Sequence, residues 1–202
     1  MRRIPLSRRS HVIGFQALTT GVAEHESALE RDFVTLVSFA DAGAVVTAQP
    51  ITIWFEHEGR RRRYTPDFRV DWTEGGIEIV EIKYRADLRT NWARLRPAFE
   101  AARRWTVANG ARFRISTERG IRGCRLEAAK RLLPLRSTAI DSVLAEQVMV
   151  HVREAPSFGE LVGKLPVPLE AALGVVWRLI ARGELTVDLD APITPSTRVT
   201  AR

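Results

Sequence analysis

Cysteine is almost missing from this sequence: the 202 residues contain one, Cys124. A single cysteine excludes an internal disulfide and any zinc site that needs several cysteines. No apolar run approaches the roughly 20 residues that a membrane-spanning helix needs, and no apolar stretch follows the N-terminal arginines as a secretory signal would require. The four histidines show no metal-ligand spacing, and no glycine-rich phosphate loop is present. We therefore expect a globular cytoplasmic protein that does not interact with membranes.

Acidic residues are too few to balance the basic ones. The sequence has 31 Lys and Arg against 24 Asp and Glu, a net charge of +7. The excess is confined to the first two thirds, since residues 1–138 hold 25 basic and 16 acidic residues, whereas residues 139–202 hold 6 and 8. A basic surface favours a polyanionic partner. If that partner is DNA, the first two thirds should make most of the phosphate contacts.

Hydrophobic spacing predicts that helices and strands are mixed along the first two thirds. Leu29, Phe33 and Leu36 recur at helical spacing, with Ser27 as a candidate N-cap and Glu30 placed to complete a capping box. Strands are predicted after this first helix at 45–46, 51–55, 60–72, 77–84 and 113–116. Two further helices are predicted at 88–108 and 121–133. This order predicts an α/β fold, in which a mixed sheet is flanked by helices.

The pattern changes near residue 139. Apolar spacing predicts three short helices, at about 140–148, 158–165 and 169–180, followed by a β-element at 184–189. Three helices and a β-element follow one another in this order in a winged helix. The third helix offers Arg178 and Arg182 but also Glu170, which is less basic than a DNA-reading helix normally is. We therefore favour protein docking over DNA reading for this small domain.

Three polar residues interrupt the apolar strands in the middle of the chain. Glu81 and Lys83 are two residues apart on a predicted strand and therefore share a face, which begins with apolar Ile77 and Ile79. Such charges are costly to bury unless they are paired or bind a metal. Asp67 lies on the predicted hairpin partner, and the register of that hairpin can place it beside Glu81.

Two converging carboxylates suit Mg²⁺, which activates water and stabilises charge in phosphodiester displacement. Lys83 can orient or help to deprotonate that water, or neutralise the phosphate. Glu30 on the first helix is the candidate for a third carboxylate. Four consecutive arginines lead into the strand of Asp67 and favour a phosphate clamp: Arg60, Arg61, Arg62 and Arg63. The combination is typical of the PD-(D/E)xK pattern of metal-dependent DNA endonucleases.

Each motif also has an ordinary explanation when taken alone. Pro66-Asp67 is a common turn dipeptide, and the pair Glu81 and Lys83 can be a simple ion pair on one strand face. Glu30 can be a capping residue, the arginine run can be a solvated hairpin tip, and Gln49-Pro50 can be a turn. It is their joint occurrence on a predicted hairpin that favours a catalytic site.

The sequence resembles the TnsA endonuclease family over about residues 24–125, and more loosely over 139–190. The resemblance is carried by Ser27-Ala28-Leu29-Glu30-Arg31-Asp32-Phe33, Gln49-Pro50, Tyr64-Thr65-Pro66-Asp67-Phe68 and Glu81-Ile82-Lys83-Tyr84. It implies a restriction-endonuclease-like fold. It also implies that Glu30, Asp67, Glu81 and Lys83 are catalytic and that the three carboxylates bind Mg²⁺, for which Mn²⁺ can substitute. Gln49 and the four arginines are candidates for DNA contacts.

The resemblance further implies a function in cut-and-paste transposition. TnsA-like subunits cut the 5′, non-transferred strand at double-stranded transposon ends, together with a TnsB-like DDE transposase. A TnsC-like AAA+ regulator binds the C-terminal part. We accordingly expect a basic N-terminal arm at 1–23, a PD-(D/E)xK nuclease domain at 24–138 and a winged-helix-like domain at 139–202. Three alternatives stay open: a stand-alone restriction or repair nuclease, a non-catalytic adaptor for DNA or a regulator, and a plain winged-helix regulator.

Overall fold

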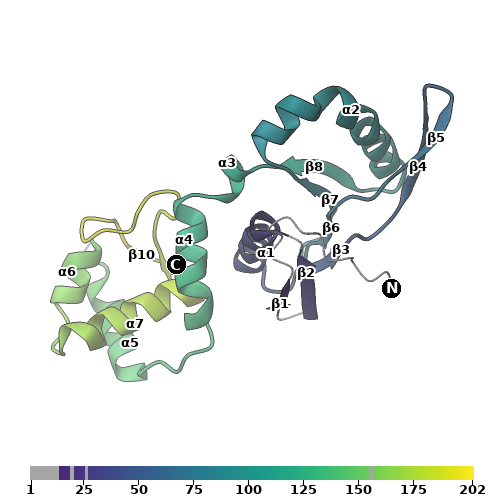
Figure 1. Ribbon diagram of the computed structural model, residues 1–202. Helices are drawn as coiled ribbons and strands as arrows, with labels where there is room; N and C mark the ends of the chain where they lie inside the picture. The colour runs from purple at the N-terminus through teal and green to yellow at the C-terminus, as the bar shows by residue number, and fades with distance from the viewer. Residues whose placement is uncertain (1–13, 19–20, 26, 155–156) are drawn as a thin grey trace. The chain divides into compact units, whose positions relative to one another are not determined.

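The computed structural model describes residues 14–18, 21–25, 27–154 and 157–202 (Figure 1). The chain divides into two compact units, Met1–Arg122 and Gly123–Arg202. The sequence places this boundary at 138/139, but helix α4 (Cys124–Leu132) contacts α7 (Leu169–Arg182) and so belongs to the second unit. None of the described helices is both long enough and apolar enough to span a lipid bilayer.

A four-stranded sheet forms the centre of the first unit. Its strand order is β3 (Val45–Ala48), β6 (Phe68–Asp71), β7 (Ile77–Ile82) and β8 (Arg112–Ser116). Strand β6 is antiparallel to both of its neighbours, whereas β7 and β8 run parallel. The predicted mixed sheet is therefore confirmed, and the strand that carries Glu81 lies in its interior.

Two helices cover the two faces of this sheet (Figure 1). Helix α1 (Ala28–Ala40) begins at the Ser27 N-cap, as predicted, because the Ser27 hydroxyl accepts the backbone N–H of Glu30. Its apolar side packs against the face that carries Val80 and Ile82, in one buried cluster. Because side chains alternate along a strand, the opposite face carries Ile79 and Glu81. Helix α2 (Arg85–Ala108) covers that face through aromatic contacts with β8, such as Phe99 with Phe113.

A separate hairpin extends from this core. Among the described residues, strands β4 (Ile53–His57) and β5 (Arg60–Tyr64) pair only with each other, around a turn in which Glu58 and Gly59 both have positive φ. The prediction of one continuous strand over 60–72 is wrong, since Thr65, Pro66 and Asp67 separate β5 from β6. Pro66 has no backbone N–H to donate to a ladder, so strand pairing stops there.

The predicted N-terminal arm contains a second small hairpin that the sequence pattern did not reveal. Strands β1 (Gly14–Leu18) and β2 (Gly21–His25) pair antiparallel. Residues 1–13, with the four arginines of the arm, lie outside the described residues.

The second unit consists mainly of helices. After α3 (Glu118–Ile121), which still belongs to the first unit, the chain forms α4, a 3₁₀ turn (Leu133–Leu135), α5 (Ser142–His151), α6 (Phe158–Gly163) and α7. The helix predicted at 121–133 is present as α4, and the three helices predicted beyond residue 139 are also present. Short strands β9 (Leu185–Thr186) and β10 (Thr200–Ala201) then pair antiparallel. With α4 included, the unit holds 10 basic and 9 acidic residues.

Candidate functional site

Strand register brings Asp67 and Glu81 together. Phe68 pairs with Val80 across β6 and β7, so Asp67, one residue before β6, lies opposite Glu81. The backbone N–H of Ile82 donates to Asp67 Oδ2 at 2.7 Å, which holds the carboxylate at the end of β7. Lys83 follows Glu81 by two residues and lies on the same face of the sheet.

The Lys83 ammonium approaches both carboxylates. Lys83 Nζ lies 2.8 Å from Glu81 Oε1 and 3.8 Å from Asp67 Oδ2. The Glu81 side chain is only 5% exposed, against 24% for Asp67 and 31% for Lys83. The hydroxyl of Tyr64 donates to the other Glu81 oxygen, Oε2, at 2.6 Å. The site therefore combines the buried carboxylate of Glu81 with two more accessible groups, the carboxylate of Asp67 and the ammonium of Lys83.

Burial and the neighbouring charges shift the pKa values of Asp67, Lys83 and Tyr64. Burial, and after it the charge of Glu81, raises the pKa of Asp67 to about 7, although Lys83 and the Ile82 N–H act in the opposite direction. Burial alone would lower the pKa of Lys83, but the charges of Asp67 and Glu81 raise it above its ordinary value. Burial and the Glu81 charge raise the pKa of Tyr64, so its hydroxyl keeps the proton that it donates.

Glu30 is the third carboxylate predicted for the site. It lies in the first turn of α1, where the Ser27 hydroxyl donates to Glu30 Oε1 at 2.9 Å. Its charge contributes to the raised pKa values of both Asp67 and Lys83, so it lies within electrostatic range of them. Among the described residues, however, no three Asp, Glu, His or Cys side chains gather closely enough to hold a metal ion. The structure thus brings two of the three predicted ligands together.

The donor set at Asp67 and Glu81 nevertheless fits a divalent cation. Both side chains offer only oxygen acceptors when ionised, which is the donor type that Mg²⁺ and Mn²⁺ prefer. The two carboxylates face one ammonium, that of Lys83, so the group keeps an excess of negative charge when both carboxylates are ionised. A bound divalent cation would remove this excess of negative charge, so the residues present are suited to one.

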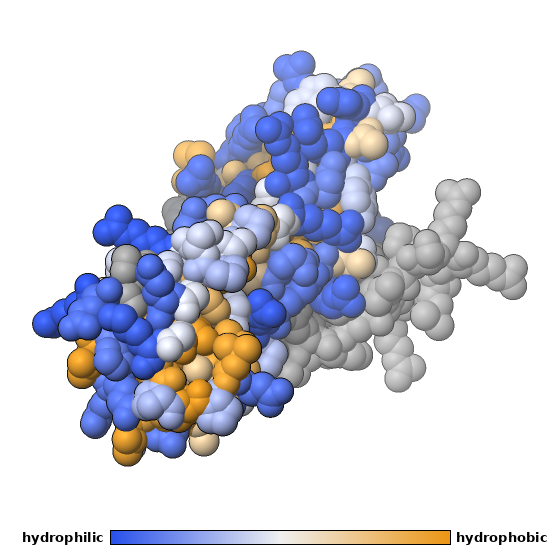
Figure 2. Space-filling model, turned by 90° about the vertical axis from the view of Figure 1, so that its left-hand side faces the viewer, coloured by the Kyte–Doolittle hydropathy of each residue, from blue (hydrophilic) through white to orange (hydrophobic). Residues whose placement is uncertain are grey.

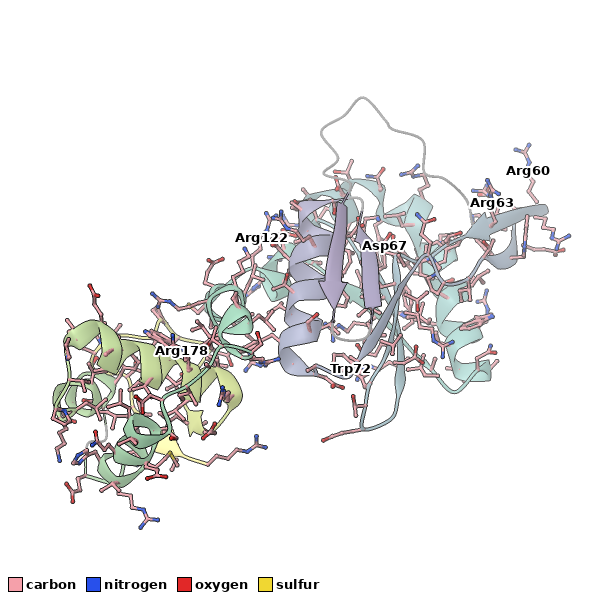
Figure 3. The ribbon with its side chains drawn as sticks, turned by 90° about the horizontal axis from the view of Figure 1, so that it is seen from below. Arg60, Arg63, Asp67, Trp72, Arg122 and Arg178 are labelled. Atoms are coloured by element: carbon pink, nitrogen blue, oxygen red, sulfur yellow. The ribbon has the colours of Figure 1, made fainter. Side chains whose placement is uncertain are left out.

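The candidate DNA contacts fall in two places. Gln49 lies beside the site, because its backbone N–H donates to the Asp67 carbonyl at 2.8 Å. The four arginines lie on β5 instead, and Figure 3 shows Arg60 and Arg63 out along the hairpin, away from Asp67. Arg61 stacks over the ring of Trp54 at 4.6 Å, and that tryptophan is 54% exposed. The hairpin of β4 and β5 is thus a basic element with an exposed aromatic side chain, Trp54.

Two residues near the site were not singled out from the sequence. Tyr64 lies on β5 yet hydrogen-bonds to β7, a contact between distant segments that spacing alone does not predict. Asp32 is only 3% exposed and pairs with Arg122 at 3.1 Å, which ties α1 to the residue that follows α3. For Asp32 the sequence did offer a signal, because a carboxylate next to Phe33 in an apolar helix indicates a buried ion pair.

One family comparison bears on the site. Residues 45–118 match the family model described as TnsA-like endonuclease N terminal. The matched range contains Asp67, Glu81, Lys83 and the arginine hairpin, whereas Glu30 and the second unit lie outside it. No curated protein matches the sequence significantly.

Proposed function

We propose that the chain is the endonuclease subunit of a heteromeric transposase, a proposal supported by the match of residues 45–118 to the TnsA-like endonuclease N-terminal model. It hydrolyses the 5′, non-transferred strand at the ends of the transposon in a Mg²⁺-dependent reaction, and a TnsB-like DDE transposase cuts and joins the other strand. The observation that carries the proposal is the placement of Asp67 opposite Glu81, with the Lys83 ammonium in contact with Glu81 and close to Asp67.

Each residue of the site has a distinct role in this proposal. Asp67 and Glu81 would hold Mg²⁺, and Glu30 would complete the acidic shell directly or through water. The bound ion supplies Lewis-acid stabilisation and a reactive water for phosphodiester hydrolysis. Lys83, whose raised pKa keeps it charged at neutral pH, neutralises the phosphate or orients the attacking water. Mn²⁺, which also prefers oxygen ligands, should replace Mg²⁺.

The basic hairpin is the proposed DNA-binding element. Side chains alternate along β5, so Arg61 and Arg63 lie on one face, and Arg60 and Arg62 on the other. A two-stranded ribbon fits the major groove of B-DNA, and arginines on both of its faces would meet the phosphates of both groove walls. Gln49, which lies beside Asp67, would contact the sugar-phosphate backbone of the DNA next to the phosphate that is cut.

The double variant Arg61→Ala/Arg63→Ala should weaken binding to duplex DNA and flatten its salt dependence. Loss of two phosphate contacts lowers the slope of log K against log [salt] by about 2. Fluorescence anisotropy over a salt series measures both quantities. The matched control, Arg153→Ala/Arg198→Ala, removes the same charge from exposed positions of the second unit. Equal slopes for the two double variants would rule out the hairpin as a phosphate-binding element.

We propose that the second unit is a winged-helix-like module that docks a TnsC-like AAA+ regulator. Its balance of 10 basic and 9 acidic residues gives little attraction for DNA. Val143 and Val150 lie seven residues apart on α5 and are 63% and 66% exposed, a spacing that places them on one helix face. Figure 2 shows hydrophobic residues at the surface of this unit among hydrophilic ones. Exposed apolar surface of this kind favours a protein partner.

Strand-specific cleavage tests the whole proposal. The chain is incubated with a transposon-end duplex carrying a different label on each strand, with and without the cognate transposase, in Mg²⁺ or EDTA. We expect a cut in the 5′ strand that needs both Mg²⁺ and the transposase. Full activity without the transposase would identify a stand-alone restriction or repair nuclease, and no cleavage under any condition would identify a non-catalytic adaptor.

A further inference from the structure

Tyr64 connects the arginine hairpin to the candidate metal site. It is the last residue of β5, in a hairpin that has no strand pairing with the four-stranded sheet. Its hydroxyl nevertheless donates to Glu81 Oε2 on the interior strand β7 at 2.6 Å. The element with the four arginines is therefore hydrogen-bonded to a proposed metal ligand.

The surroundings of Tyr64 show that the hydroxyl, and not only the ring, has a defined place. The ring packs edge-on against Phe99 and Phe113, with centroids 6.0 and 6.5 Å away. A phenylalanine would fill this apolar space without a polar atom to satisfy. The hydroxyl instead points at a carboxylate that is 5% exposed, where a charge-assisted O–H···O⁻ bond is short and strong.

The two oxygens of Glu81 have different partners as a result. Oε2 accepts the Tyr64 hydroxyl at 2.6 Å, and Oε1 faces Lys83 Nζ at 2.8 Å. With Oε2 held, rotation of the carboxylate is restricted, and Oε1 stays on the side where Lys83 Nζ also approaches Asp67. Partners of this kind behind a metal ligand fix its orientation, and removing one typically costs about 10–100-fold in metal affinity or activity.

We infer that Tyr64 is a positioning residue, whose hydroxyl orients Glu81 so that Oε1 is presented to the cation shared with Asp67. The inference rests on the proposed function, because it assumes that Asp67 and Glu81 bind a metal. It adds a residue that neither the carboxylate motif nor the arginine run includes.

Metal binding by the full-length chain, without any nuclease reaction, tests this role. Isothermal titration with Mn²⁺ well below the melting temperature should give roughly 10-fold weaker binding for Tyr64→Phe, which keeps the ring and removes only the hydroxyl. The chain has two tyrosines, so Tyr84→Phe is a matched control with an unchanged affinity. Phe113→Leu disturbs the ring packing but keeps the hydroxyl, and should lower the melting temperature without weakening Mn²⁺ binding.

The outcomes separate the positioning role from the proposed function. If Tyr64→Phe binds Mn²⁺ as tightly as the wild type while Asp67→Asn does not bind, the metal site stands and the positioning role is wrong. If Phe113→Leu weakens Mn²⁺ binding as much as Tyr64→Phe does, Tyr64 acts through packing alone, and the role of its hydroxyl is again wrong. If the wild type itself does not bind Mn²⁺, the proposed function fails.

Discussion

Asp67→Asn is expected to reduce strand cleavage by more than about 100-fold. Substitution of a residue that only supports a metal ligand costs about 10–100-fold, so loss of a direct carboxylate ligand should cost more. The amide keeps an oxygen that can accept the Ile82 N–H, which Asp67 Oδ2 accepts at 2.7 Å, so the local backbone should be retained. The measurement is the single-turnover rate of 5′-strand cleavage with the transposase present.

A matched control for this variant lies at the far end of β6, the strand that Asp67 precedes. Asp71 is four residues further along, at the end of β6, and pairs with Arg69 at 2.6 Å instead of facing Glu81. Asp71→Asn should therefore cleave at close to the wild-type rate. Wild-type cleavage by Asp67→Asn would remove this carboxylate from the catalytic site, and equal losses in the two variants would point to a general effect on the sheet.

The meeting of Asp67 and Glu81 was predictable from local rules. Period-two alternation places Glu81 and Lys83 on one face, and the turn at Gly75-Gly76, both with positive φ in the structure, pairs their strand with the preceding one, which follows Asp67. These rules act over short separations, so a single sequence carries them. The Ser27 cap of α1, the interior position of β7 and the three helices beyond residue 139 follow from rules of the same kind.

What the sequence did not predict depends on contacts between distant segments. Tyr64 hydrogen-bonds to Glu81 from a separate hairpin, since residues 65–67 divide the predicted strand into two strands that belong to different sheets. The assignment of α4 to the second unit depends on its packing against α7, some forty residues later. Periodicity describes which face of an element is apolar, but it does not say which other element covers that face.

The charge asymmetry of the chain changes with this boundary. With the boundary at residue 138, the first part of the chain holds the entire excess of positive charge. With the boundary at residue 122, four basic residues of α4 and the following turn belong to the second unit: Arg125, Lys130, Arg131 and Arg136. Part of that charge is neutralised within the unit, since Arg125 pairs with Asp190 at 2.9 Å and Lys130 with Glu127 at 3.4 Å. The exposed apolar residues of α5, Val143 and Val150, therefore favour a protein partner more strongly than the net charge does.

The metal-free chain is expected to lose stability as the pH rises from about 4 to about 7, and Mg²⁺ should reverse this loss. The pKa of Asp67 is about 7 in the folded chain and 3.8 ordinarily. Between these values the folded state keeps a proton that the unfolded state releases, so the free energy of unfolding falls with rising pH. At the proposed site Mg²⁺ would bind the ionised carboxylate of the folded state, so its stabilising effect should grow over the same range.

Thermal unfolding at pH 5 and pH 8, in EDTA or in Mg²⁺, measures this linkage. Asp67→Asn cannot ionise at this position, so in EDTA it should melt above the wild type at pH 8 by at least ~3 °C, the shift that about 1 kcal/mol produces in a chain of this size. The difference should shrink at pH 5, where the wild-type carboxyl is protonated. Mg²⁺ should raise the melting temperature of the wild type at pH 8 but not that of Asp67→Asn. Equal Mg²⁺ stabilisation of both proteins would mean that the ion binds elsewhere.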